Sequence, residues 1–152
     1  MAGARTPKDW IDLRRRYAFP WQVVGRQWLE PHLFAHWFGP LGYTVSAYRL
    51  VPVEGGEWWV TLRAPDGSES TVSGHYLEID LPHVLRLSWA PGRAADLAQE
   101  TEVVLRMEPS AGGTLLRLRH GPFAEPELRE ANRIAWDSTL DSLALQLVED
   151  PG

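Results

Sequence analysis

The stretch 126-PELREANRIAWDSTLDSLALQLVE-149 closes the chain and predicts one long helix. Four apolar residues recur along a single stripe of that helix, at Trp136, Leu140, Leu143 and Leu147. Two turns earlier the same stripe carries Arg129 and Asn132. A helix that is apolar in its C-terminal half and polar in its N-terminal half, on one face, indicates a helix laid over a sheet with a chamber under one end.

Most of the chain before this helix has the alternating pattern of strands. The spacing predicts two short helices, at 21–29 and 32–38, on either side of Pro31. Strands are expected at 10–19, 43–51, 57–64, 70–79, 84–89, 100–108 and 114–120, with a longer loop or lid at 91–99. Tight turns join most of these strands, so we expect an antiparallel meander whose concave face the long helix covers. The predicted fold class is α+β.

Composition narrows the classes of function. A chain of 152 residues with 44% hydrophobic residues is the size of one domain, expected at 10–149 between flexible termini at 1–9 and 150–152. The net charge of −5 argues against nucleic-acid binding. The chain has no cysteine, which removes disulfides and thiol chemistry, and no apolar run long enough for a membrane span. We expect a cytoplasmic protein without a cofactor.

Other motifs exclude further chemistry. His32 and His36 stand four residues apart, but they lack the glutamate of the zinc-protease motif and a clear third ligand, so we expect no metal. The chain has no Gly-x-Ser-x-Gly, P-loop or dinucleotide-binding motif.

Several segments in order resemble a known family. They are 33-LFAHWFGP-40, 54-EGGEW-58, 74-GHYLEIDLP-82 followed by Ser88-Trp89, then Gly112-Gly113-Thr114 with His120, and Trp136 followed by Leu140 and Leu143. Together they resemble the helix-grip fold of the START/birch-allergen-like superfamily (SRPBCC). Within it, the chain is similar to the branch named after the activator of the 90-kDa heat-shock protein's ATPase. The likeness covers roughly residues 10–149, with departures at Gly25 and Ala135, where the branch usually has an aromatic residue and glycine. Both positions lie near the chamber in that fold, so the resemblance implies that they shape the chamber differently from that of relatives.

The resemblance implies a cavity between sheet and helix that binds a hydrophobic or amphipathic small molecule, and it implies no single reaction. Six residues are the expected cavity wall: Trp58, Tyr76, Trp89, His120, Asn132 and Trp136. Trp37 and Phe38 are expected to gate or pack one end. Gly74, on the strand face assigned to Tyr76 and Glu78, is expected to make room for a helix or a ligand.

Two alternatives stay open at this level. One is a polyketide aromatase or cyclase, in which His120, Tyr76 or Glu78 transfers protons within the chamber. The other is a co-chaperone-like module that binds a chaperone partner through an exposed apolar patch, with Trp59 on the convex face as the visible candidate. A monomer and a homodimer are both compatible with the sequence.

Overall fold

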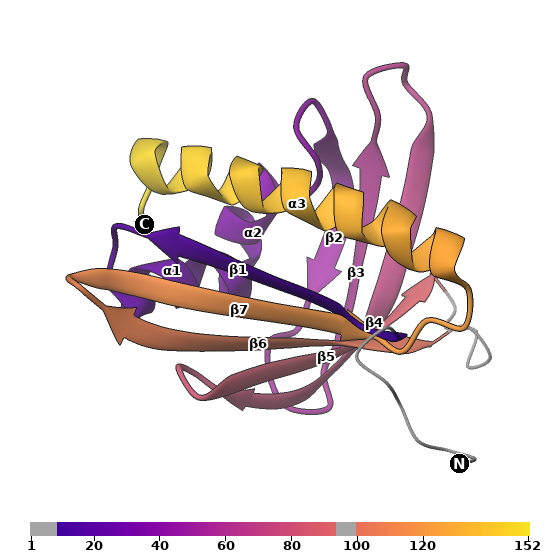
Figure 1. Cartoon of the computed structure of the whole chain (residues 1–152). Helices are drawn as coiled ribbons and strands as arrows, with labels where there is room; N and C mark the ends of the chain where they lie inside the picture. The colour runs from indigo at the N-terminus through magenta and orange to yellow at the C-terminus, as the bar shows by residue number, and fades with distance from the viewer. Residues whose placement is uncertain (1–8, 94–99) are drawn as a thin grey trace, which may run out of the picture.

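Seven antiparallel strands form one curved sheet, and a long helix lies across it (Figure 1). The computed structural model describes residues 9–93 and 100–152. The strands are β1 (Ile11–Tyr17), β2 (Thr44–Leu50), β3 (Glu57–Arg63), β4 (Glu69–Asp80), β5 (Val84–Pro91), β6 (Thr101–Ser110) and β7 (Gly113–Gly121). The helices are α1 (Trp21–Leu29), α2 (Pro31–Trp37) and α3 (Pro126–Glu149). This arrangement is the expected α+β helix-grip fold.

The order of strands in the sheet is β1-β7-β6-β5-β4-β3-β2. Neighbours in this order are neighbours in sequence, except that β1 pairs with β7. The edge strands β1 and β2 are therefore joined by α1 and α2, which must cross from one edge of the sheet to the other. On the way, α1 packs against β6 and β7, and α2 packs against β2 and α3. The two short helices thus share the concave side of the sheet with α3.

The apolar stripe of α3 is buried as the periodicity predicts. Trp136 is 4% exposed, and Leu140, Leu143 and Leu147 are fully buried. Each buried leucine contributes roughly 1.5–3 kcal/mol through loss of apolar surface from water. The Tyr17 hydroxyl of β1 donates a hydrogen bond of 2.9 Å to the Leu140 carbonyl oxygen. α3 is therefore attached to the edge of the sheet as well as packed on its face.

The expected element boundaries hold closely. The helices at 21–29 and 126–149 coincide with α1 and α3, and α2 begins and ends one residue earlier than predicted. β5 extends to Pro91, two residues beyond the predicted strand end. The predicted loop or lid at 91–99 falls mostly on 94–99, and the predicted N-terminal tail mostly on 1–8; both lie outside the described residues.

Candidate functional site

A cluster of aromatic rings fills the space between α3 and the sheet. Trp89 of β5 is its centre, with ring centroids 5.2 Å from Trp58, 5.3 Å from Trp136 and 6.0 Å from Phe38. Trp136 comes from α3, and Phe38 directly follows α2, so side chains from three parts of the fold meet at Trp89. Rings at such separations attract one another through tilted and edge-to-face contacts. Four of the predicted wall and gate residues are thus brought together.

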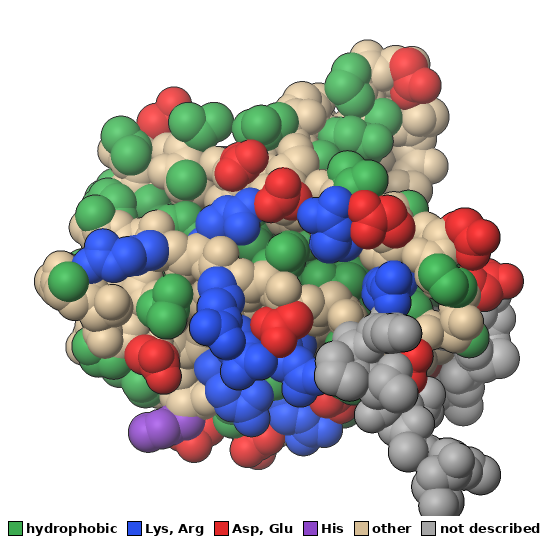
Figure 2. Space-filling view, in the orientation of Figure 1, with side chains coloured by type: hydrophobic (Ala, Val, Ile, Leu, Met, Phe, Trp, Pro, Cys, Tyr) green, Lys and Arg blue, Asp and Glu red, His purple; other side chains and the backbone are tan. Residues whose placement is uncertain are grey.

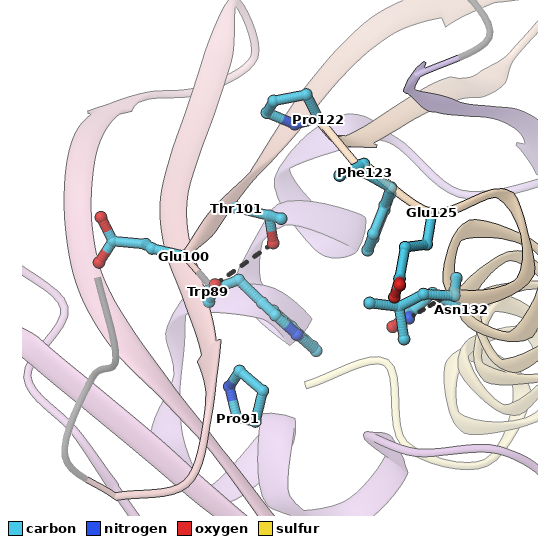
Figure 3. A pocket seen from close by; sticks show the side chains of 10 residues that line it. Trp89, Pro91, Glu100, Thr101, Pro122, Phe123, Glu125 and Asn132 are labelled. Carbon is cyan, nitrogen blue, oxygen red and sulfur yellow. Dashed lines mark hydrogen bonds between the residues drawn. The ribbon is translucent and has the colours of Figure 1, made fainter. Parts of the chain in front are cut away.

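Three spaces surround this cluster. An inner cavity of about 10 Å³ is lined by Trp28, Phe34, Phe38, Leu50, Trp58, Tyr76, Leu87, Trp89 and Trp136. A side pocket of about 60 Å³ is lined by Phe38, Gly39, Pro40, Leu62, Trp89, Asn132, Ala135, Trp136 and Thr139. An outer pocket of about 380 Å³ is lined by Trp89, Pro91, Glu100, Thr101, Pro122, Phe123, Ala124, Glu125, Leu128 and Asn132 (Figure 3). Trp89 lines all three, so its partly buried side chain stands between the outer pocket and the inner cavity.

His120 lies beneath this cluster, fully buried, and lines none of the three spaces. The Trp136 indole N–H donates to its Nδ1 at 2.9 Å. Because an indole nitrogen can only donate, Nε2 carries the proton of the imidazole and donates to the Thr101 hydroxyl oxygen at 2.7 Å. Thr101 in turn donates to the Trp89 carbonyl oxygen at 3.3 Å, so both nitrogens of the ring are occupied.

Burial also fixes the charge of His120. Removal from water lowers the pKa of the imidazole from 6.5 to about 3, because the charged form is poorly solvated in this core. The ring is therefore neutral near pH 7, and its lone pair is engaged by Trp136. This geometry suits a residue that joins α3 to β7 and does not suit a proton-transfer residue.

Glu78 does not share a face with Tyr76, contrary to the alternation predicted from sequence. A β-bulge between Tyr76 and Glu78 shifts the register of β4 against β5, so Tyr76 pairs with Leu87 whereas Glu78 pairs with Arg86. An extra residue in one strand reverses the faces that follow it. Tyr76 lines the inner cavity, while the Glu78 carboxylate lies 3.4 Å from the Arg86 guanidinium on the opposite face.

The enzymatic hypothesis requires at least two of Tyr76, His120 and Glu78 to converge in the chamber. Tyr76 alone lines the inner cavity, because Glu78 points away and His120 lies outside the cavity wall. Burial raises the pKa of the Tyr76 phenol, which keeps its proton in place. The convergence that proton-transfer chemistry needs is absent from this set of three residues.

Gly74 makes room for protein backbone. A Cβ atom at Gly74 would lie 1.9 Å from the Ser88 carbonyl oxygen of β5. That oxygen accepts a hydrogen bond of 3.2 Å from the Trp58 indole N–H, and Trp58 pairs with Gly74 across β3 and β4. The absence of a side chain thus allows the close approach that holds Trp58 against β5, and the space is not left for a ligand.

The remaining predicted residues are placed as follows. Asn132 is partly buried, lines both the outer and the side pocket, and donates to the Leu128 carbonyl oxygen of its own helix at 2.9 Å. Trp37 lines none of the three spaces and packs behind them, where its indole N–H donates to the Gln27 carbonyl oxygen at 3.0 Å. Arg129 is partly buried and does not line them.

The two departures from the branch pattern have different surroundings. Ala135 lines the side pocket beside Trp136, as expected. Gly25 lies instead in a groove between α1 and the end of β4. A Cβ atom at Gly25 would lie 3.1 Å from Leu81 Cδ1. The expectation that Gly25 shapes the chamber is therefore wrong for this chain.

Two contributors to the site were not singled out from the sequence. Trp28 lines the inner cavity; the pattern of α1 placed it on an apolar helix face, which was the available signal. Thr101 supports His120, and nothing in its sequence context distinguishes it from any threonine that begins a strand. Its role depends on the pairing of β6 with β5 and β7, which brings it beside Trp89 and His120.

The outer face of β1 and β7 is rich in arginine (Figure 2). Arg117 lies opposite Arg14 on one side and Arg106 on the other, and it donates to both carboxylate oxygens of Asp12, at 3.1 and 2.7 Å. On β3, Trp59 is only partly exposed, because the Arg93 guanidinium lies 3.8 Å above its ring. The Arg93 guanidinium thus covers part of Trp59, which does not present the open apolar surface that the co-chaperone hypothesis expects of it.

Two predictions from the sequence concern metal ions and membrane spans. His32 of α2 lies 3.8 Å from the Glu30 carboxylate, and no group of three or more metal-binding side chains gathers within 9–93 and 100–152. In the same part of the chain, no helix combines the length and the apolar character needed to cross a membrane.

Solved structures with the same fold come from several bacteria. A protein from Nitrosomonas europaea is 22% identical, with 96% of this chain and 98% of that chain covered and a TM-score of 0.79. A protein from Chromobacterium violaceum is 22% identical over 90% and 95% of the two chains, with a TM-score of 0.80. A Silicibacter pomeroyi protein described as AHSA1 is 22% identical over 93% and 99%, with a TM-score of 0.79. These likenesses establish the fold.

No curated protein sequence matches this chain. A family model does match it, over residues 18–147, and that span includes α1, α2, β2 to β7 and nearly all of α3. The chain therefore belongs to the family of proteins like the activator of Hsp90 ATPase homolog 1.

Proposed function

We propose that this protein binds a hydrophobic or amphipathic small molecule between α3 and the sheet. The observation that carries the proposal is the position of Trp89, which lines the outer pocket, the side pocket and the inner cavity together. Ligand pockets are commonly concave, mainly apolar spaces with a few polar groups at their walls. The outer pocket combines Trp89 and Phe123 with the polar groups of Thr101 and Asn132 (Figure 3).

The inner cavity is too small for a ligand in this conformation, at about 10 Å³. A ligand entering from the outer pocket would displace the Trp89 side chain, which separates the two spaces. The walls of the inner cavity would then supply apolar burial, and Asn132 and Thr101 would contact the polar end of an amphipathic molecule at the entrance.

Native mass spectrometry of the gently purified protein tests the proposal. We expect extra mass that disappears on denaturation. Ala124→Trp should fill the outer pocket and reduce the bound fraction, because Ala124 lies in its wall and is itself exposed. Ala47→Trp is the matched control, since Ala47 is also exposed but lies on the edge strand β2, outside the pocket wall. A clean mass for the wild-type protein, or equal bound fractions in the two variants, would contradict the proposal.

A further inference from the structure

Three arginines stand side by side on the outer face of the sheet. Arg117 of β7 pairs with Arg14 of β1 on one side and with Arg106 of β6 on the other. Its neighbours Leu116 and Leu118 are fully buried in the core, so Arg117 projects from the opposite face, where Figure 2 shows basic side chains gathered. Like charges directly opposite one another on adjacent strands are destabilising. A row of three arginines therefore needs an explanation other than stability.

The row is only partly compensated by acidic side chains. Arg117 donates to both carboxylate oxygens of Asp12, and these bonds, with the charges of Arg119 and Arg14, hold the pKa of Asp12 below its usual value. Within 9–93 and 100–152, the guanidinium groups of Arg14 and Arg106 form no ion pair and no hydrogen bond. Two uncompensated cations thus flank a compensated one.

A shallow hollow adjoins the row at Arg106. It has a volume of about 540 Å³ and is lined by Pro82, His83, Val84, Arg106, Met107, Glu108 and Pro109. The two prolines and Val84 give it an apolar part, and Arg106 belongs both to the hollow and to the row. Glu108 is the one carboxylate in its lining. A partner could therefore place an apolar side chain in the hollow and an anionic group on Arg106 together.

The surroundings favour a short anionic segment over a long polyanion. The chain carries a net charge of −5, so the surface beyond the arginines is acidic on balance and would repel a nucleic acid or an anionic bilayer. A guanidinium group binds a carboxylate through two parallel hydrogen bonds, as Arg117 already does with Asp12. Alternate side chains of an extended peptide lie about 6.6 Å apart on one face, so two or three carboxylates can reach a row whose strands are about 4.8 Å apart.

We propose that the row Arg14, Arg117 and Arg106 is the docking surface for an acidic peptide segment of a partner protein. An apolar residue of the segment occupies the hollow, and its aspartate or glutamate side chains bind Arg106 and Arg14. The segment relieves the repulsion between the arginines, which the protein itself leaves uncompensated. This surface lies on the other side of the sheet from α3, so it is separate from the proposed small-molecule site.

Fluorescence anisotropy with a labelled peptide, Leu-Ser-Glu-Ser-Glu-Ser-Glu, tests the proposal. We expect it to bind the wild-type protein at least about tenfold more tightly than the same peptide with glutamine in place of glutamate. Binding should weaken as the salt concentration rises from about 0.05 M to about 0.3 M, because the charges are exposed. Replacing the leucine of the peptide by serine should weaken binding about three- to tenfold, through loss of apolar burial in the hollow.

A double variant assigns the binding to the row. Arg14→Gln with Arg106→Gln should weaken peptide binding at least about tenfold, and it should fold at least as stably as the wild type because the opposed charges are removed. Arg49→Gln with Arg63→Gln is the matched control, since it changes the net charge equally on β2 and β3, at the other edge of the sheet. The control should keep the wild-type affinity.

Several results would overturn the proposal. They are no binding of the peptide by the wild-type protein, equal affinity for the glutamate and glutamine peptides, and an equal loss of affinity in the two double variants. Equal affinity for the leucine and serine peptides would overturn the part assigned to the hollow. Sedimentation with vesicles of phosphatidylglycerol and phosphatidylcholine in equal parts should leave the protein in solution; binding to vesicles without binding to the peptide would assign this face to a membrane instead.

Discussion

His120 is neutral in the folded protein because its ring is buried and both of its nitrogens are engaged. The Trp136 indole N–H fills the Nδ1 lone pair, and Nε2–H is directed at the Thr101 hydroxyl. Protonation would require Nδ1 to give up the Trp136 hydrogen bond and would place a charge in an aromatic core. The residue thus connects α3 to β7 and β6, and acid should weaken this connection.

The free energy of unfolding should fall as the pH is lowered from about 6.5 towards 3. In the unfolded chain His120 binds a proton near pH 6.5, whereas in the folded protein the pKa of the ring is lowered to about 3 by burial. Protons in this window therefore favour the unfolded state, with a slope of at most about 1.4 kcal/mol per pH unit from this group. Urea denaturation at several pH values measures the slope.

The His120→Asn variant should show a flatter dependence of stability on pH between 3 and 6.5, together with a lower stability at pH 7. The control is His75→Asn, because His75 is exposed on β4, and this variant should keep the wild-type slope. Identical slopes in wild-type protein and His120→Asn would show that His120 is not the group that acid titrates.

Helix α3 has two faces with very different roles. Its inner face packs on the concave sheet, while Ile134, Leu145 and Val148 on other faces are more than half exposed. Apolar residues on both faces explain why composition alone does not identify the buried side. The i, i+4, i+7 spacing of the buried residues does identify it, because only that stripe is continuous along the helix.

Replacing leucine by alanine on these two faces should separate burial from helix propensity. Leu140→Ala should lower the free energy of unfolding by about 2–5 kcal/mol, because Leu140 is fully buried and its removal leaves a cavity. Leu145→Ala, at a position that is 59% exposed, should change it by less than about 0.5 kcal/mol. Urea denaturation monitored by circular dichroism gives both values, and similar losses would contradict the assigned inner face.

At the scale of the whole molecule, one hydrophobic core joins distant parts of the chain. It includes Ile11 of β1, Trp28 of α1, Trp58 of β3, Leu105 of β6 and Leu147 of α3. The pairing of β1 with β7 also joins the beginning of the described chain to the strand that precedes α3. These contacts join residues from both ends of the described chain in one packed core.

We therefore expect unfolding in a single cooperative transition, as the prediction of one domain requires. Far-ultraviolet circular dichroism reports the helices and strands, and tryptophan fluorescence reports the aromatic core around Trp89. The two signals should give the same urea midpoint. Two separate midpoints would mean that α3 or the short helices leave the sheet before it unfolds.

The sequence by itself determined the elements of this protein. Local periodicity predicts the helix at 126–149, its buried stripe and the α1 helix. Pro20, Pro31 and Pro126 mark the starts of α1, α2 and α3. Such patterns depend only on residues close in sequence. The tight turns between strands predicted an antiparallel meander covered by the long helix. The family resemblance added the expectation of a space near Trp58, Tyr76, Trp89 and Trp136.

The tertiary structure alone decided what each site residue can do. The face of Glu78 depends on a β-bulge, and a bulge belongs to the pairing of two strands and not to the sequence of one. The engagement of His120 depends on Trp136 and Thr101, which only folding brings to its two nitrogens. Strand and helix follow from neighbours along the chain, whereas hydrogen-bond partners and cavities arise from neighbours in space.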